Sequence, residues 1–166
     1  KLLAISNIGA LKWDNAAMIT AWDQQGAATP NGYNMGGEFD GATPAIADID
    51  GDGKPEIVMG KVATNGDGSI KWGFNYYTKF GSASAGCAFG LCSSQIVDLD
   101  LDGIQEVVAG FTAYNSDGSI RWNHPEIGDG SDGSTAIGNF DEDPYPEIVL
   151  SATFSGSAAI YLLEHT

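Results

Sequence analysis

The chain has 166 residues, which is long enough for one domain with a sizeable core. Its net charge is −15, from 22 acidic and 7 basic residues, so no nucleic-acid partner is expected, because phosphate binding requires a basic surface. No apolar run approaches the ~20 residues that span a bilayer, so no direct membrane insertion is expected either. The 23 glycines favour an all-β fold with many turns.

The first segment, residues 1–13, reads as two short strands around a turn, and its pattern recurs at 62–72 and 112–122. In each copy a glycine stands four residues before a tryptophan: Gly9 and Trp13, Gly68 and Trp72, Gly118 and Trp122. The two later copies contain Asp-Gly, which is a hairpin turn signal. We therefore interpret Asp67 and Asp117 as turn residues, and the tryptophans as core anchors rather than a ligand platform.

A nine-residue loop at 48–56 carries acidic side chains at positions 1, 3, 5 and 9 and a glycine at position 6. Alternate carboxylates followed by a glycine bend a backbone around a hard cation. The sequence therefore predicts a Ca²⁺ site whose ligands are the side chains of Asp48, Asp50, Asp52 and Glu56 and the main-chain carbonyl of Lys54.

The loop recurs twice. At 98–106 the corresponding ligands are Asp98, Asp100, Asp102, Ile104 and Glu106. At 139–147 they are Asn139, Asp141, Asp143, Tyr145 and Glu147, with Pro144 in place of the glycine. Proline fixes φ near −65° and cannot take the left-handed turn of a glycine, so the third site is expected to be weaker or altered.

Two other readings compete with a metal loop. Asp-Gly-rich loops are often plain turns, but three copies in register favour cation sites. An EF-hand needs a twelve-residue loop between two helices, whereas short β-branched runs flank each loop here. Each loop is therefore expected to join two strands of a hairpin.

The spacing defines a repeat. Asp48 to Trp72 and Asp98 to Trp122 are both 24 residues apart, whereas the connectors between repeats vary in length. A constant four-stranded body with variable connectors is typical of a β-propeller blade. The sequence predicts an all-β propeller segment with a half blade at 1–13 and blades of four antiparallel strands at 43–72, 94–122 and 135–163.

The pattern Asp-x-Asp-x-Asp-Gly-x-x-Glu between two apolar strands, clearest at 41–58 and 93–108, resembles the FG-GAP/VCBS-type repeat of integrin α-subunit propellers and many bacterial surface proteins. The resemblance covers nearly all of residues 41–163 and implies a Ca²⁺ role for the three ligand sets named above. It does not specify one function, because members of the family bind proteins, bind sugars or form the propeller of some polysaccharide lyases.

About three blades do not close a ring, since propellers typically have four to eight. A fragment of a longer chain is the favoured interpretation. The alternatives are closure with other copies, where the N-terminal hairpin would complete a neighbour's third blade, and a head-to-tail filament.

The variable connectors are the expected ligand face. They contain the candidate ligand-binding aromatics Trp22, Tyr33, Tyr76 and Tyr77, which suit sugar stacking or a protein interface but would equally fill gaps between blades. Cys87 and Cys92 have four residues between them and form a candidate disulfide in an oxidising compartment; the alternative is two unpaired thiols.

We expect a secreted or cell-surface, non-catalytic, calcium-stabilised propeller module that binds a protein or glycan. One alternative is a structural subunit of an extracellular filament or matrix. Another is the propeller portion of a polysaccharide lyase or hydrolase, which is disfavoured because no pair of catalytic carboxylates and no catalytic motif is recognisable.

Overall fold

The computed structural model describes residues 3–14, 44–59, 62–72, 87–88, 91–92, 94–124, 127, 132–154 and 157–166. Its regular elements are all β-strands, which confirms the predicted all-β class. No helix among these residues is long and apolar enough to cross a membrane.

Two four-stranded antiparallel sheets form the centre of the molecule. The first sheet contains β3 (Ala45–Ala47), β4 (Glu56–Met59), β5 (Val62–Thr64) and β6 (Ile70–Trp72), in that order. The second contains β9 (Ser94–Val97), β10 (Glu106–Ala109), β11 (Thr112–Tyr114) and β12 (Ile120–Asn123). Each is a simple meander, because every strand pairs with the strand that follows it in the chain.

The third sheet has three strands, where a four-stranded repeat was predicted. It contains β13 (Asp132–Gly138), β14 (Glu147–Phe154) and β15 (Ser157–Leu163). The equivalence to the other sheets is clear, because Ile148 pairs with Leu163 as Val107 pairs with Tyr114. Among the described residues, no fourth strand pairs with β15.

Two hairpins complete the described fold. β1 (Leu3–Ile5) pairs with β2 (Leu11–Asp14), and we call this pair the N-terminal hairpin. β7 (Cys87–Ala88) pairs with β8 (Leu91–Cys92).

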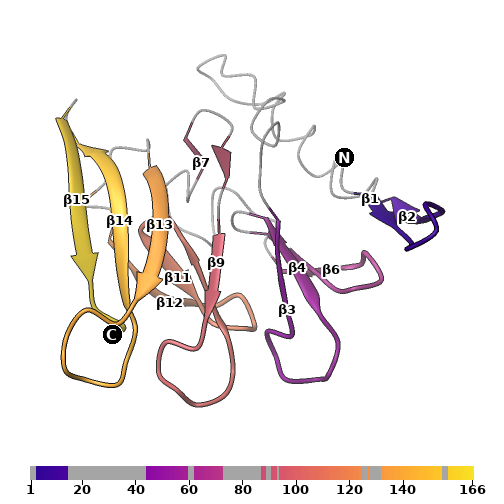
Figure 1. The fold of residues 1–166 in the computed structure, drawn as a ribbon, viewed down its shortest axis with the longest axis horizontal. Helices are drawn as coiled ribbons and strands as arrows, with labels where there is room; N and C mark the ends of the chain where they lie inside the picture. The colour runs from indigo at the N-terminus through magenta and orange to yellow at the C-terminus, as the bar shows by residue number, and fades with distance from the viewer. Residues whose placement is uncertain are drawn as a thin grey trace.

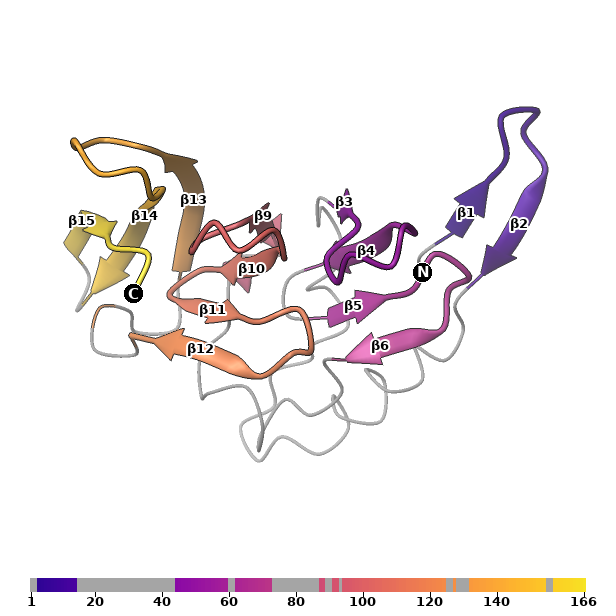
Figure 2. The ribbon, with the colours of Figure 1, turned by 90° about the horizontal axis from the view of Figure 1, so that it is seen from below.

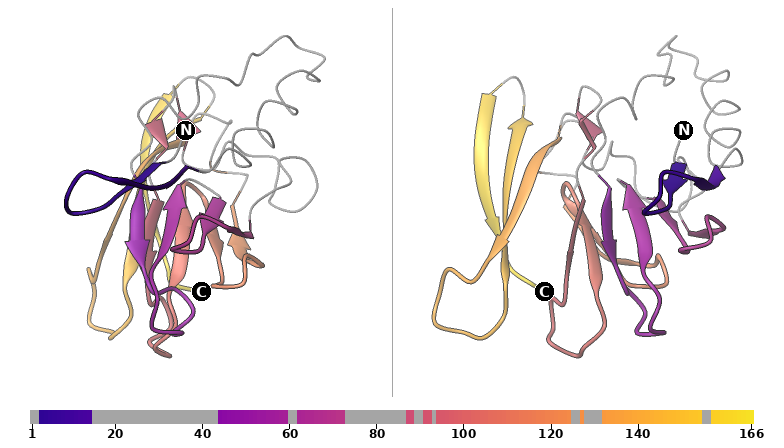
Figure 3. Two further views of the ribbon diagram at one scale, coloured as in Figure 1. Left: turned by 90° about the vertical axis from the view of Figure 1, so that its right-hand side faces the viewer. Right: turned by 45° about the vertical axis from the view of Figure 1, so that its right-hand side comes forward.

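The sheets stand side by side in an open row, with the N-terminal hairpin at one end and the third sheet at the other (Figures 1 and 2). The described residues do not close into a ring. The first strands β3, β9 and β13 lie next to one another, and the loops that follow them lie along one side of the row, at the bottom of Figure 1 (see also Figure 3).

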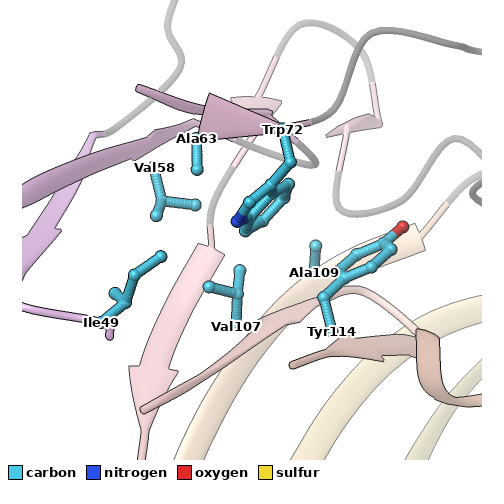
Figure 4. Packing of buried hydrophobic residues seen from close by; sticks show 7 residues of the cluster. All are labelled: Ile49, Val58, Ala63, Trp72, Val107, Ala109 and Tyr114. Atoms are coloured by element: carbon cyan, nitrogen blue, oxygen red, sulfur yellow. The ribbon is translucent and has the colours of Figure 1, made fainter. Parts of the chain in front are cut away.

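Both faces of β10, in the second sheet, are buried, because its alternate side chains point to opposite neighbours. Val107 packs toward the first sheet in a cluster with Ile49, Val58 and Trp72 (Figure 4). Val108 packs toward the third sheet in a cluster with Ile148. This alternation explains why every residue of β10 is buried.

Candidate metal loops

In the first and second loops (residues 48–56 and 98–106), the carboxylates at positions 1, 3 and 9 come together. Oxygens of Asp48, Asp50 and Glu56 lie within 4.8 Å of one another, as do those of Asp98, Asp100 and Glu106. This is the spacing of a three-carboxylate site for a hard cation, which prefers oxygen ligands.

The carboxylate at position 1 holds the loop closed by accepting hydrogen bonds from backbone N–H groups at positions 5 and 6. Both oxygens of Asp48 accept backbone hydrogen bonds, from Asp52 at 3.0 Å and from Gly53 at 2.8 Å, and Asp98 accepts the same two bonds. Position 6 must be left-handed for this geometry, with φ of 84° at Gly53 and 92° at Gly103. The glycine that the sequence analysis singled out is thus required for the loop.

The position-9 glutamate is buried and anchors the start of the loop. Glu56 Oε2 accepts a hydrogen bond from the Ile49 backbone N–H at 3.0 Å, and Glu106 Oε2 accepts one from Leu99 at 2.8 Å. Burial raises the pKa of Glu106 above its usual value, against the opposing effects of this bond and of Arg121.

A basic residue from the last strand of the same sheet completes each of these two sites. Lys71 Nζ bonds to Asp50 and lies 3.7 Å from Glu56 Oε1. Arg121 Nη1 bonds to Asp100 at 2.8 Å and lies 3.8 Å from Glu106 Oε1. The hydrogen bond from each basic group holds the pKa of Asp50 and of Asp100 below the usual value.

Sequence reasoning missed these two cations, although a signal was present. Only seven residues are basic, and Lys12, Lys71 and Arg121 each stand directly before the repeat tryptophan. A basic residue repeated at this position, in a chain with twelve acids in its three loops, was sufficient to indicate an internal counter-ion.

The position-5 acids lie outside the three-carboxylate groups. Asp52 Oδ1 accepts a hydrogen bond from the Lys54 backbone at 2.7 Å, and Asp102 Oδ1 accepts one from Ile104 at 2.8 Å. The roles of Asp52 and Asp102, and of the carbonyls at Lys54 and Ile104, as ligands remain predictions.

The third loop (residues 139–147) is built differently. Asn139 Nδ2 donates to the Asp143 carbonyl and, at 3.2 Å, to the Tyr145 carbonyl. Proline at position 6 lacks the N–H that Gly53 and Gly103 donate to position 1. An amide donor thus points at the Tyr145 carbonyl, which was predicted to face a cation.

The cluster of three acids at the third loop is also made of different residues from those of the first two loops. It joins Asp141 and Glu147 with Glu164, which follows β15 and which sequence analysis did not select. Glu147 Oε2 accepts a hydrogen bond from the Phe140 backbone, but Oε1 is buried without a hydrogen-bond partner among the described residues.

The remaining predicted residues are the four candidate ligand-binding aromatics and the two cysteines of the candidate disulfide. Trp22, Tyr33, Tyr76 and Tyr77 lie outside the described residues. Cys87 and Cys92 are backbone partners in the β7–β8 pair. Opposed residues of an antiparallel pair have Cα atoms ~4.5–5.5 Å apart, within the range that a disulfide bridges, so this backbone pairing suits the predicted bond.

Comparisons with known proteins gave one structural similarity. No family model and no curated protein matches the chain. A solved structure of the V. cholerae biofilm matrix protein Bap1 matches with a TM-score of 0.59 and 27% sequence identity. The match covers 75% of this chain but 19% of Bap1, so the chain corresponds to a small part of that protein. At this level the chain is similar in fold to a segment of a biofilm matrix protein.

Proposed function

We propose that this chain is a calcium-stabilised β-propeller segment, of the FG-GAP/VCBS type, in an extracellular adhesion or matrix protein. The observation that carries the proposal is the pair of equivalent loops. Each brings three carboxylates together beside one basic side chain, Lys71 in the first loop and Arg121 in the second. The three stacked meanders with their first strands adjacent support the propeller architecture. The similarity to Bap1 supports an extracellular location.

Charge explains why a divalent ion suits the first two loops. The first loop has four acids, offset by Lys71 and by the exposed Lys54. The second has four acids offset by Arg121 alone. Two or three negative charges remain in each loop, and Ca²⁺ neutralises most of this excess while binding the oxygens that now accept only backbone hydrogen bonds.

The stability of the folded chain tests this proposal. A site with a Kd of about 0.1 mM adds roughly 1.4 kcal/mol at millimolar Ca²⁺, and two sites shift the melting temperature of a chain this size by about 5–10 °C. Thermal melts in 1 mM CaCl₂ and in EDTA measure the shift, with NaCl at matched ionic strength as the control. An equal melting temperature in Ca²⁺ and EDTA after complete metal removal contradicts the calcium role.

Two extracellular roles remain to be separated. A recognition module binds a protein or a glycan through the connectors, without catalysis, whereas a matrix subunit assembles or holds polymer. The similarity to a biofilm matrix protein favours the matrix role. Co-sedimentation with purified matrix polysaccharide, together with a glycan array, distinguishes them: binding of polymer without a discrete sugar ligand identifies the matrix role.

A further inference from the structure

The basic residues beside the first and second loops share a position in the strand register. Lys71 has no pairing partner on β5, because the residues on either side of it pair with consecutive residues of that strand. Arg121 is left out in the same way where β12 pairs with β11, and Lys12 where β2 pairs with β1. Each is the extra residue of a β-bulge, and such bulges re-aim a side chain.

In the first and second sheets, the bulge directs the basic side chain toward the metal loop of the same sheet. The amine of Lys71 and the guanidinium of Arg121 contact the carboxylates at positions 3 and 9, which are two of the three that come together. The two basic side chains are only 18% and 20% exposed, so water and salt screen these contacts in part. A cation bound by the same carboxylates would share two of its ligands with the basic group.

The shape of each loop is held by contacts that do not involve the basic residue. Asp48 and Asp98, at position 1, accept bonds from the backbone N–H groups of positions 5 and 6. Glu56 and Glu106, at position 9, accept a bond from the backbone N–H of position 2. Removing the positive charge therefore leaves these oxygens in place and makes their surroundings more negative.

The second loop also has a carboxylate oxygen that a cation would satisfy. Asp100 Oδ1 is buried and has no hydrogen-bond partner among the described residues, whereas Oδ2 accepts a bond from Arg121. In the first loop, the corresponding Asp50 Oδ1 accepts a bond from the Asp52 N–H at 3.2 Å. Carboxylate oxygens are ligands that Ca²⁺ prefers, so the residues of the second loop fit this ion even with Arg121 in contact.

On the basis of the calcium role proposed above, we propose that the bulge residues Lys71 and Arg121 set the calcium affinity of the two loops. Each is an internal counter-ion that stabilises the ion-free loop and repels a bound dication. This repulsion keeps the affinity in the ~10⁻⁴ to 10⁻³ M range of extracellular sites, although each loop carries four acids.

The proposal predicts two effects of opposite sign when the charge of a bulge residue is removed. The ion-free chain loses stability, because the buried glutamate loses its basic partner. Calcium binding becomes tighter, because the repulsion is gone while the ligand oxygens are still held by the backbone. A purely structural role predicts the same sign for both, since a distorted loop is less stable and also binds less well.

Lys71→Met and Arg121→Met in the full chain test these signs, because methionine keeps an unbranched apolar stem and removes the charge. Calorimetric titration with CaCl₂ is expected to show that each substitution lowers the Kd of its own loop by about tenfold or more. The other loop is expected to keep its Kd. Thermal melts in EDTA are expected to show a lower melting temperature for both variants than for the unaltered chain.

Two further variants separate the bulge charge from other effects. Lys71→Arg keeps the charge and introduces the residue that the second loop already uses, so it is expected to keep the Kd of the first loop within about threefold. Lys54→Met removes the same charge from the first loop, but from a side chain that is 77% exposed and contacts Asp52 at position 5. Its expected effect on the Kd is below about threefold, because an exposed charge is screened.

The outcomes distinguish this inference from the calcium role itself. Calcium binding that both methionine variants leave unchanged or weaken overturns the inference and leaves the calcium role standing. An effect of Lys54→Met as large as that of Lys71→Met also overturns it, because net charge and not the bulge residue would then set the affinity. Binding by the methionine variants alone supports the inference and contradicts a calcium role in the unaltered chain, whereas no binding by any of them overturns both.

Discussion

The interior of the row and its two ends are built from the same repeat, but they differ in how many of the repeat's buried polar groups have a partner. In the first and second sheets, the buried glutamate faces a basic side chain: Glu56 faces Lys71, and Glu106 faces Arg121. Trp72, between these sheets, has a turn carbonyl for its N–H. At the ends, Glu147 Oε1 and Trp122 Nε1 have no hydrogen-bond partner among the described residues, and no described ring lies over Gly9. The comparison teaches that the buried glutamate depends on the fourth strand of its own sheet. The tryptophan N–H and the turn glycine depend on the neighbouring sheet, as in stacked repeats.

The turn glycines give the largest expected contrast. Gly118→Ala combines left-handed strain with a clash against Trp72, and we expect a loss of about 3 kcal/mol. Gly9→Ala has the same strain without the clash, so its expected loss is about 1 kcal/mol. Urea unfolding of both variants measures the difference, and equal losses would show that the ring contact contributes nothing.

The buried glutamates come next. Glu106→Gln removes a charge that faces Arg121, with an expected loss of about 2 kcal/mol. Glu147→Gln removes a charge without a basic partner among the described residues, and we expect a change below about 0.5 kcal/mol. Thermal melts at low protein concentration measure both, and a larger effect at Glu147 would contradict the assignment.

Calcium affinity is expected to be higher at the second loop than at the third. Asp98→Asn weakens an intact three-carboxylate group, and we expect about a tenfold loss of affinity at that loop, or about 1.4 kcal/mol. Asn139→Asp replaces the amide that now bonds to two loop carbonyls, and is expected to strengthen binding at the third loop. Calorimetric titration resolves the sites. Unchanged binding in both variants would show that position 1 is not a ligand.

The tryptophan N–H groups provide a smaller contrast. Trp72→Phe leaves the Ser116 carbonyl without its donor and is expected to destabilise the chain by about 1 kcal/mol more than Trp122→Phe does. Both substitutions lose the same volume, so the difference isolates the hydrogen bond. Chemical denaturation of the two variants in parallel provides the measurement, and the reverse order would contradict it.

Acid sensitivity is the smallest expected difference. The Ser69 and Ser119 hydroxyls hold the pKa of Asp67 and Asp117 below the usual value. These carboxyls therefore stabilise the fold above about pH 3.8, and their contribution is lost as pH falls through the lowered pKa. The equivalent turn residue of the N-terminal hairpin is Ile8, which cannot titrate.

Stability measured between pH 5 and 3 tests this sign. The double variant Asp67→Asn and Asp117→Asn is expected to lose less stability on acidification than the unaltered chain. An identical pH profile would show that the turn carboxyls do not contribute.

The sequence by itself determined the features that are local in the chain. Acids at positions 1, 3, 5 and 9 with a left-handed glycine predicted loops between strands, and Asp-Gly predicted the turns. The substitution of Pro144 predicted an altered third loop, because a missing N–H and a fixed φ act within a few residues. The four-stranded repeats at 45–72 and 94–123 followed from the constant spacing.

Only the tertiary structure decided which groups meet across larger separations. Lys71 reaches Asp50 from 21 residues away, and Trp72 reaches Ser116 from 44 residues away. Glu164 joins Asp141 and Glu147 because β15 returns beside β14. Such contacts depend on sheet register and on the stacking of neighbouring sheets, which spacing in one sequence does not specify. For that reason the candidate metal loops were visible in the sequence, whereas the basic side chains beside them, Lys71 and Arg121, were not.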